Sequence, residues 1–421
     1  MYTRRPRRYL CVLFTLTTVI AANALGTGLA AADAITQIID ETGDGVGNVL
    51  NSARGIGVDA AGNAYVTGFN SDNAFKITPT GVITQIIDVV GDDVGNGLDS
   101  PLGIAADTAG NVYVTGGNSH NAFRITPAEV ITQIIDATGD GAGNGLDSPL
   151  GIAAHTAGNV YVTGFTSENA FKITPGGLIT EIIDASGDGA GNGLAGARVI
   201  ALDAGGNTYM TGESSDNAFK ISPTGVITEI IDATGDGAGN GCDGPEGIAV
   251  DAASDVYVAC CNSDNAFRIT PAGVITEIID STGDGAGNGC DGPRGVAVDA
   301  AGNVYVTCFN SDNAFKITPV GVITEIIDEA GDGAGNGLDG PRGVAVDAAG
   351  NAYVTGEVSD NAFKVTLDED DDGVANEVDV CPNTPAGLPV DCEGRPLRDC
   401  NGDCLFDGDD IQCIVDELLN Q

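Results

Sequence analysis

Apolar and polar positions alternate along most of the chain in short runs that recur every 48 residues. Each unit holds four β-prone runs of the type GVAVD, NVYVT, NAFKIT and GVITEII, separated by turn-forming segments such as AAGN, NSDN and TPVG. The motif ITQIID or ITEIID marks the repeat and ends seven times in aspartate, at Asp40, Asp88, Asp136, Asp184, Asp232, Asp280 and Asp328. Four strands per unit at this period predict one blade of a β-propeller.

The two ends of the array predict a closed ring. The array opens with a single ITQIID run at Ile35 and closes with three runs between Gly343 and Thr366, so the last blade lacks its outermost strand. We expect the first strand to fill that place, which leaves no unpaired edge. One tyrosine and one phenylalanine per unit are expected to pack between blades. The sequence therefore predicts an all-β, seven-bladed propeller of four-stranded blades over residues 35–366.

The repeat carries a family resemblance. The runs from Pro293 to Thr307 and from Asn313 to Gly321 resemble the NHL-type repeat, and the match extends over all seven units. This resemblance implies a propeller fold and leaves the activity open, because propellers serve both binding proteins and enzymes. The chain has no tryptophan, which argues against the tryptophan-aspartate class of propellers.

Residues 1–34 predict a secretory signal. Four arginines precede an apolar run from Tyr9 to about Ile20, and small residues up to Ala34 supply a cleavage site after Ala32 or Ala34. No later stretch is apolar for long enough to span a bilayer. We expect a secreted, extracellular or cell-surface protein, with the periplasm as an alternative, and cysteines exposed to oxidation.

The charge balance excludes one class of partner. The chain has 60 acidic and 17 basic side chains and a formal charge of −43, so it repels nucleic acid. Only two histidines are present, so a catalytic site would depend on carboxylates, hydroxyls or a metal. We expect a monomeric ring whose partner is an extracellular protein or a glycan.

Residues 367–398 predict a calcium-binding segment. Oxygen donors stand at loop positions 1, 3, 5, 7, 9 and 12, with Gly373 at the turn: Asp368, Asp370, Asp372, the Val374 carbonyl, Asn376 and Asp379. Ca²⁺ prefers six to eight such oxygens in a tightly wound loop. Together with the following Cys381 and Pro382, the segment resembles a thrombospondin type 3 repeat. The alternative is an acidic, solvated linker.

Residues 399–421 predict a second calcium loop followed by one short helix with an apolar face. Its donors are Asp399, Asn401, Asp403, the Leu405 carbonyl, Asp407 and Asp410. Cys404 replaces the usual glycine at position 6. The segment resembles one half of a dockerin or EF-hand; because a dockerin has two halves, docking to a cohesin is in doubt. Ca²⁺ and disulfides are the predicted stabilisers of this small tail.

The propeller connectors contain a weaker form of the same pattern. Copies such as Asp136–Asp147 place oxygens at positions 1, 3, 5, 9 and 12, whereas other copies lose one or more of them. Either calcium or glycine-rich turns supported by aspartates would explain the pattern.

Cysteines and histidines depart from the repeat at a few positions. Cys242 with Cys260 and Cys290 with Cys308 would lie at one end of antiparallel strands, so they are candidate disulfides, with free thiols as the alternative. Cys261 has no evident partner. His155 replaces the aspartate that ends the innermost strand, and His120 replaces the aspartate of NSDN. Drift within the repeat explains both histidines.

Three functions are consistent with this sequence. The leading hypothesis is a secreted, non-enzymatic, calcium-binding protein with a binding or scaffold role, because the loops look uniform whereas a catalytic site breaks the symmetry of one rim. The first alternative is a metal-dependent propeller enzyme of the lactonase or streptogramin-lyase type, which would need His155 or an asymmetric acidic cluster in the central channel. The second alternative is a structural component of the cell surface.

Overall fold

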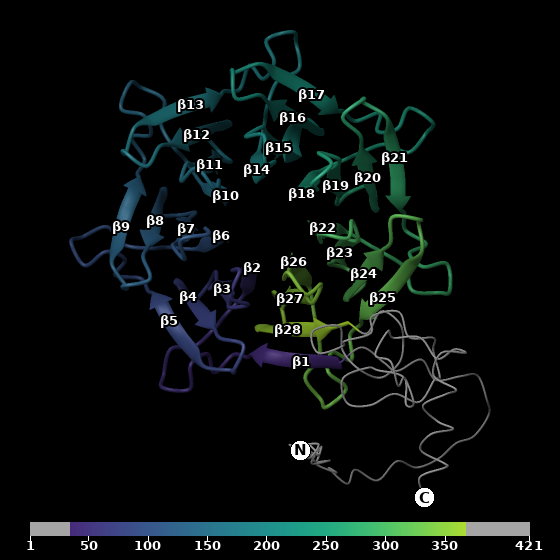
Figure 1. Cartoon of the computed structure of the whole chain (residues 1–421), viewed down its shortest axis with the longest axis horizontal. Coiled ribbons are helices and arrows are strands. Elements are labelled where there is room, and N and C mark those ends of the chain that lie inside the picture. Colours follow the sequence, from purple (N-terminus) through teal and green to yellow (C-terminus); the bar gives the residue numbers. More distant parts are fainter. Residues whose placement is uncertain (1–33, 368–421) are drawn as a thin grey trace, which may run out of the picture. The chain divides into compact units, whose positions relative to one another are not determined.

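The computed structural model describes residues 34–367, which form a ring of seven four-stranded antiparallel sheets (Figure 1). The predicted all-β, seven-bladed propeller is therefore confirmed. Residues 35–365 make up one compact unit. Residues 1–33 of the predicted secretory signal and all the predicted calcium ligands from Asp368 to Asp410 lie outside the described residues.

Each of the first six blades runs from its innermost to its outermost strand in chain order. Blade 1 contains β2 (Ala53–Val58), β3 (Ala64–Gly68), β4 (Asn73–Ile77) and β5 (Ile83–Ile87). Blade 2 contains β6 (Pro101–Ala106), β7 (Val112–Gly116), β8 (Asn121–Ile125) and β9 (Ile131–Ile135). Blade 3 contains β10 (Pro149–Ala154), β11 (Val160–Gly164), β12 (Asn169–Ile173) and β13 (Ile179–Ile183). Blade 4 contains β14 (Ala197–Leu202), β15 (Thr208–Gly212), the 3₁₀-helix η1 (Glu213–Ser215), β16 (Asn217–Ile221) and β17 (Ile227–Ile231).

The last three blades follow the same plan. Blade 5 contains β18 (Pro245–Val250), β19 (Val256–Cys260), β20 (Asn265–Ile269) and β21 (Ile275–Ile279). Blade 6 contains β22 (Pro293–Val298), β23 (Val304–Cys308), β24 (Asn313–Ile317) and β25 (Ile323–Ile327). Blade 7 contains β26 (Pro341–Val346), β27 (Ala352–Gly356), β28 (Asn361–Thr366) and, from the start of the chain, β1 (Ala34–Ile39).

The ring closes through this seventh blade. β1 pairs with β28 in the strand order β1-β28-β27-β26, as the sequence predicts. The boundary between blades 7 and 1 also has the hydrogen bond that joins neighbouring blades elsewhere in the ring. The Ser52 amide donates to Asp360 Oδ1 at 2.5 Å, just as the Ser100 amide donates to Asp72 Oδ1 at 2.8 Å between blades 1 and 2. At the boundary between blades 2 and 3, His120 replaces the aspartate, and its Nδ1 accepts from the Ser148 amide at 3.1 Å. His120 therefore takes over the role of the residue that it replaces.

The core lies between neighbouring blades. Tyr65 of blade 1 packs in one cluster with Val114 and Phe123 of blade 2, and the same arrangement recurs around the ring. All seven repeated phenylalanines are fully buried. Their burial confirms the predicted packing role of the aromatic residues, which are the largest apolar groups that the repeat supplies.

The innermost strand of every blade contains a register irregularity near its start. In blade 3, Pro149 pairs with Gly164 and Ile152 with Val162, so Leu150 and Gly151 lie in a bulge. Gly151 is required there because an added Cβ would lie 2.4 Å from the carbonyl oxygen of Arg198 in the next blade. Bulges re-aim side chains, and here the bulge turns the residue before the glycine toward the axis of the ring.

Two disulfides brace blades 5 and 6. Cys242 pairs with Cys260 and Cys290 with Cys308, each with a Cα–Cα distance of 5.2 Å, which confirms the predicted pairs. Cys261 is the free cysteine among residues 34–367. Two disulfides indicate an oxidising extracellular or periplasmic environment. Over the same residues, no helix reaches the length and apolarity that crossing a membrane would require.

A candidate binding site at the mouth of the central channel

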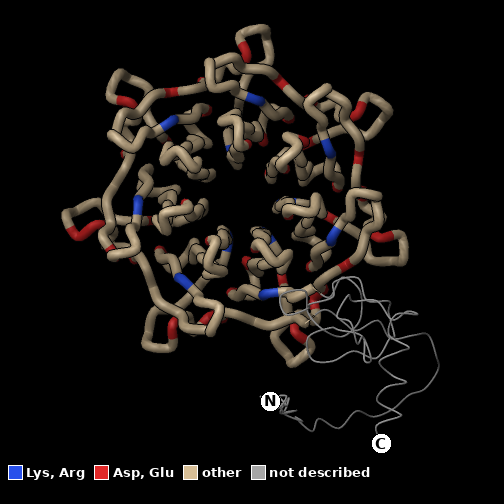
Figure 2. The backbone as a smooth tube through the Cα atoms, viewed as in Figure 1, with Lys and Arg blue, Asp and Glu red and all other residues tan. Residues whose placement is uncertain are grey.

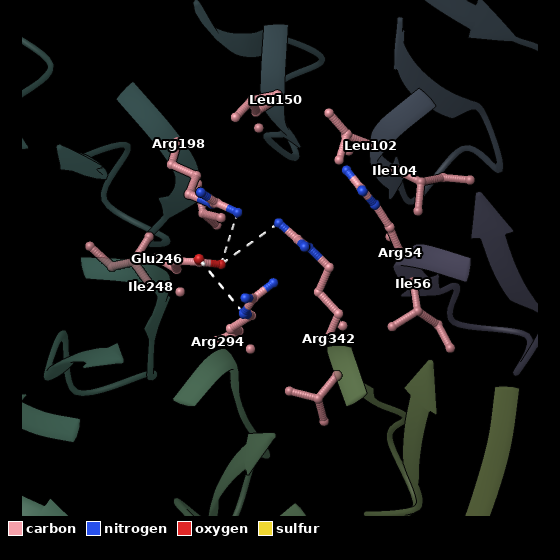
Figure 3. A pocket seen from close by; sticks show the side chains of 18 of the residues that line it. Arg54, Ile56, Leu102, Ile104, Leu150, Arg198, Glu246, Ile248, Arg294 and Arg342 are labelled. Carbon is pink, nitrogen blue, oxygen red and sulfur yellow. Dashed lines mark ion pairs between the residues drawn. The ribbon is translucent and has the colours of Figure 1, made fainter. Parts of the chain in front are cut away.

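The residue just before the innermost-strand glycine changes its chemistry from blade to blade. These seven residues line a cavity of about 190 Å³ on the axis of the ring, here called the mouth (Figure 3). In chain order they are Arg54, Leu102, Leu150, Arg198, Glu246, Arg294 and Arg342. The expected uniformity of the blades is therefore wrong at this position.

Basic residues are concentrated at the mouth beyond what the repeat requires. Between residues 34 and 367, seven basic side chains occupy one fixed position on the third strand of each blade: Lys76, Arg124, Lys172, Lys220, Arg268, Lys316 and Lys364. The four remaining basic side chains of this range are the four arginines of the mouth. Figure 2 shows the repeated basic positions around the ring and the further ones near the axis. Within residues 34–367, every basic side chain outside the repeated position therefore lies at the mouth.

A second set of variable residues follows the second strand of each blade and supplies partners to the mouth. Its members are Phe69, Gly117, Phe165, Glu213, Cys261, Phe309 and Glu357. The Arg54 guanidinium lies 3.5 Å from the centre of the Phe69 ring, and the Arg294 guanidinium lies 3.6 Å from that of Phe309. Stacking of this kind holds a guanidinium in one orientation without neutralising it.

Three glutamates pair with the arginines. Arg198 donates to Glu213 and, through Nη2, to Glu246 Oε2 at 2.9 Å. Glu357 accepts from Arg54 Nη2 at 2.8 Å and from Arg342 Nη1 at 2.6 Å. The mouth thus carries four positive and three negative side chains, which leaves one positive charge in excess.

Arg294 has the weakest pairing of the four. Its Nε lies 3.8 Å from Glu246 Oε1, beyond hydrogen-bonding distance, and is buried without a hydrogen-bond partner. Arg342 Nη2 also lies 3.8 Å from Glu246. The Glu246 side chain is only 7% exposed, so its single charge is shared among three guanidinium groups. The positive surplus of the mouth is therefore concentrated on the side of Arg294 and Arg342.

The electrostatics of the mouth shift three titrating groups. Burial acts to raise the pKa of Glu357, but Arg342 and Arg54 outweigh it and hold that pKa below its usual range. Burial and the neighbouring Arg342 lower the pKa of Arg54, against the effect of Glu357. Burial and Glu246 raise the pKa of the Cys261 thiol, which is therefore a poor nucleophile.

The other side of the mouth is apolar. Leu102 and Leu150 line the cavity from blades 2 and 3, between Arg54 and Arg198 and across from Arg294 and Arg342 (Figure 3). Two residues further along the innermost strands, the cavity is lined by the branched side chains Ile56, Ile104, Ile152, Ile248, Val296 and Val344. The arrangement can hold a small ligand that has one charged end and one apolar end.

His155 directly follows β10, the innermost strand of blade 3, at the end away from the mouth. In blade 1 the equivalent Asp59 accepts from the Ala61 amide at 2.9 Å, from the amide and the side chain of Asn63, and from Tyr65 Oη at 2.8 Å. His155 keeps part of this role, since its Nδ1 accepts from the Ala157 amide at 3.1 Å. Its strand contributes Leu150, Gly151 and Ile152 to the cavity, and His155 is not among the residues that line it.

The carboxylates of the connectors support the turns. Asp140 accepts from the Ala142 amide at 2.8 Å and from the Asn144 side chain at 2.8 Å, and the first of these bonds is the main cause of its lowered pKa. Over residues 34–367, no group of three or more His, Cys, Asp or Glu side chains is placed to hold a metal ion.

Sequence reasoning missed the mouth although its signal was present. When the seven units are aligned on the innermost-strand glycine, which is Val199 in blade 4, the preceding residue reads Arg, Leu, Leu, Arg, Glu, Arg and Arg in chain order. The variation is easily taken for drift. Only the ring geometry brings together residues that are 48 or more positions apart.

Comparison with known proteins shows the fold alone. No family model matches the chain, and no curated protein matches it. Virginiamycin B lyase from Staphylococcus aureus has a similar structure, with a TM-score of 0.62 and 19% identity over 80% of this chain and 99% of that one. A streptogramin B lyase gives a TM-score of 0.63 with 16% identity over 81% and 100% of the two chains. Hydrazine synthase from Kuenenia stuttgartiensis gives 0.54 with 14% identity over 75% and 96%.

Proposed function

We propose that this protein is an exported, non-enzymatic binding protein that holds a small ligand at the mouth of its ring. The observation that carries the proposal is that the four non-repeated arginines of residues 34–367 meet three glutamates around one cavity. Burying charged groups costs free energy, and apolar residues of similar volume stabilise a core at least as well. Leu102 and Leu150 occupy the same position in two blades, so the charges serve recognition rather than stability.

A binding role fits the mouth better than the metal-dependent lyase that was the first alternative. The carboxylates of the mouth are engaged by arginines, which compete with a cation for the same oxygens. His155 supports a turn at the other end of its strand. The likeness to streptogramin lyases lies below 20% identity and is a likeness of fold, so it gives no preference for their chemistry.

The size of the cavity narrows the kind of ligand. A cavity of about 190 Å³ admits a small molecule or the end group of a larger one. An extracellular protein or a glycan would therefore present a terminal group to the mouth. A purely structural role at the cell surface gives no reason for a charged cavity on the axis.

The calcium-binding tail is part of the proposal. The spacing of the oxygen donors from Asp368 to Asp379 and from Asp399 to Asp410 supports it. Calorimetric titration of the full chain with Ca²⁺ tests it. We expect heat and stoichiometry to fall in a chain carrying Asp370→Asn and Asp372→Asn, and calcium uptake that these changes leave intact would contradict the assignment.

The binding function is tested by equilibrium dialysis. The protein is dialysed against a defined mixture of sugars, amino acids, carboxylic acids and phosphate esters, and the retained compounds are measured by mass spectrometry. We expect at least one compound to be enriched by the wild-type chain and lost from Arg342→Leu.

A matched control separates the mouth from general charge. Lys220→Leu removes one positive charge at the repeated position, where Lys220 lies over Tyr209, and is expected to retain the same compounds as wild type. Retention that survives Arg342→Leu, or no retention by wild type, would contradict a ligand site at the mouth. Conversion of any compound in the mixture would instead support the enzyme alternative.

A further inference from the structure

The surplus positive charge of the mouth has a definite location. Glu357 accepts from Arg54 and Arg342, and Arg198 binds both Glu213 and Glu246. Arg294 makes no hydrogen bond to a carboxylate within residues 34–367. A charge that is only partly compensated in a largely buried site is unfavourable, so a bound anion would stabilise the mouth.

The guanidinium of Arg294 is held ready for such an anion. It is stacked on Phe309 at 3.6 Å, and its side chain is only 21% exposed, so little conformational freedom is lost on binding. Arg342 is held from the other side by Glu357, while its Nη2 is directed toward Glu246. Figure 3 shows both guanidinium groups extending toward the cavity. Two planar guanidinium groups suit a planar carboxylate, because each offers parallel N–H donors.

The apolar side of the cavity adds a second requirement. Leu102 and Leu150 line the cavity across from Arg294 and Arg342, and Ile104 and Ile152 continue the apolar surface. A ligand that covered only the arginines would leave these side chains in contact with water. Burial of an apolar group against them would be favourable by about 25 cal/mol per Å² removed from water.

We propose that the mouth binds a monocarboxylate that carries a compact apolar group. One negative charge matches the single positive surplus, whereas a dianion would leave a negative excess. The cavity of about 190 Å³ has room for a short branched or aromatic acid. This inference rests on the proposed binding function and names the ligand class of the same site.

The test uses calorimetric titration of the full chain with four probes at low ionic strength. Benzoate has both features, acetate has the charge alone, benzamide has the apolar ring alone, and inorganic phosphate is a compact anion without an apolar part. We expect benzoate to bind at least about tenfold more tightly than each of the other three, since a charge-assisted hydrogen bond and a buried ring each contribute about that factor. Equal binding of phosphate or of benzamide would overturn the proposal.

Variants assign the two parts of the ligand to the two sides of the mouth. Arg294→Gln is expected to weaken benzoate by about tenfold or more and to leave benzamide unchanged. Leu150→Asn is expected to weaken benzoate and to leave acetate unchanged. Lys220→Gln is the matched control and keeps the wild-type affinity for benzoate. Thermal unfolding checks that each variant is folded, and Arg294→Lys, which keeps the charge, is expected to retain part of the affinity even if Arg294→Gln is unstable.

The outcomes distinguish this inference from the proposed function. If the dialysis experiment finds a compound whose retention depends on Arg342 while benzoate does not bind, the ligand class is wrong and the binding function stands. If neither experiment detects a ligand at the mouth, both proposals fail. Benzoate binding that is unaffected by Arg294→Gln and Arg294→Lys would overturn the assignment to this side of the mouth.

Discussion

The two ends of the innermost strand differ in how strictly they follow the repeat. At the end away from the mouth, here called the far end, six of the seven blades have aspartate just after the strand, and His155 is the exception. At the mouth end, the equivalent position holds arginine, leucine or glutamate. The same strand, repeated seven times, is thus constant at one end and variable at the other.

The hydrogen bonds at the two ends explain this difference. Asp107 accepts from Asn111 and Tyr113, both within six residues of it in its own blade, so a copy of the repeat can satisfy this carboxylate without help from other blades. The side chains at the mouth also bind residues of other blades: Glu357 of blade 7 binds Arg54 of blade 1 in addition to Arg342 of its own blade. A position whose partners are local stays constant, whereas a position on the axis is free to serve recognition.

The backbone at the mouth nevertheless follows the repeat. Thr163 Oγ1 donates to the carbonyl of Arg198 in the next blade at 2.7 Å, and Thr211 Oγ1 donates to that of Glu246 at 2.9 Å. The repeat therefore fixes the backbone position of each mouth residue and does not restrict the type of its side chain. Recognition can change by substitution at this position without disturbing the blades.

Acid should have the largest effect, because it acts on both ends of the strand. Burial acts to raise the pKa values of Asp59, Asp107 and Asp203, but hydrogen bonds from asparagine, tyrosine and backbone amides outweigh it and lower them. The pKa of Glu357 is lowered as well. Groups whose pKa is lower in the folded state stabilise it above their ordinary pKa of about 4, and this contribution disappears as the pH falls through the folded-state values.

Urea unfolding between pH 7 and pH 2.5 measures this effect. We expect the free energy of unfolding to be level above about pH 5 and to fall steeply below about pH 4. Asp203→Asn should have a smaller slope in the acid range, since one lowered pKa is removed. A decline that starts between pH 7 and pH 5 would contradict the primary role of the carboxylates.

Glu246→Gln should have the next largest effect, and it acts at the mouth alone. The substitution raises the positive surplus while Arg198, Arg294 and Arg342 stay in place. Removing one member of a buried ion pair costs 3–5 kcal/mol in full burial, and the partial exposure of the arginines reduces our expectation to about 2 kcal/mol of unfolding free energy.

Anion dependence separates this effect from simple loss of packing. Benzoate is expected to restore part of the stability of Glu246→Gln, because it supplies the missing negative charge. Glu213→Gln is the control: Glu213 is 28% exposed and pairs with Arg198, so a loss of about 1 kcal/mol or less is expected. A Glu246→Gln chain as stable as wild type would show that the charges of the mouth are not coupled.

The fold could be predicted from the sequence because its determinants are local and repeated. The period of 48 residues, the turn motifs and the missing outer strand of blade 7 each leave a direct trace in the chain. The disulfides could be proposed because Cys242 and Cys260 stand at strand ends whose pairing the antiparallel order fixes. These features need no knowledge of how distant blades meet.

The mouth could not be predicted in the same way. Arg54 and Arg342 are 288 positions apart, and their shared contact with Glu357 exists only because the ring closes. The sequence did suggest a place to look for an enzyme, at His155, but strand geometry puts that residue at the opposite end from the cavity-lining Leu150. Side-chain direction within the bulge was the missing information.

His155→Asp should have the smallest effect, and of opposite sign, because it restores the repeat at the far end. An aspartate there would accept from the Asn159 side chain and from Tyr161 Oη, as Asp59 does from Asn63 and Tyr65. It would also remove the buried Nε2 of His155, which has no hydrogen-bond partner. We expect a gain of about 1 kcal/mol in unfolding free energy by urea titration.

The reverse change, Asp107→His in blade 2, is the control and should cost a similar amount of unfolding free energy. Benzoate affinity should not change in either chain, because the mouth lies at the other end of the strand. A His155→Asp chain that is less stable, or that binds benzoate differently, would show that this histidine has a function that the repeat does not explain.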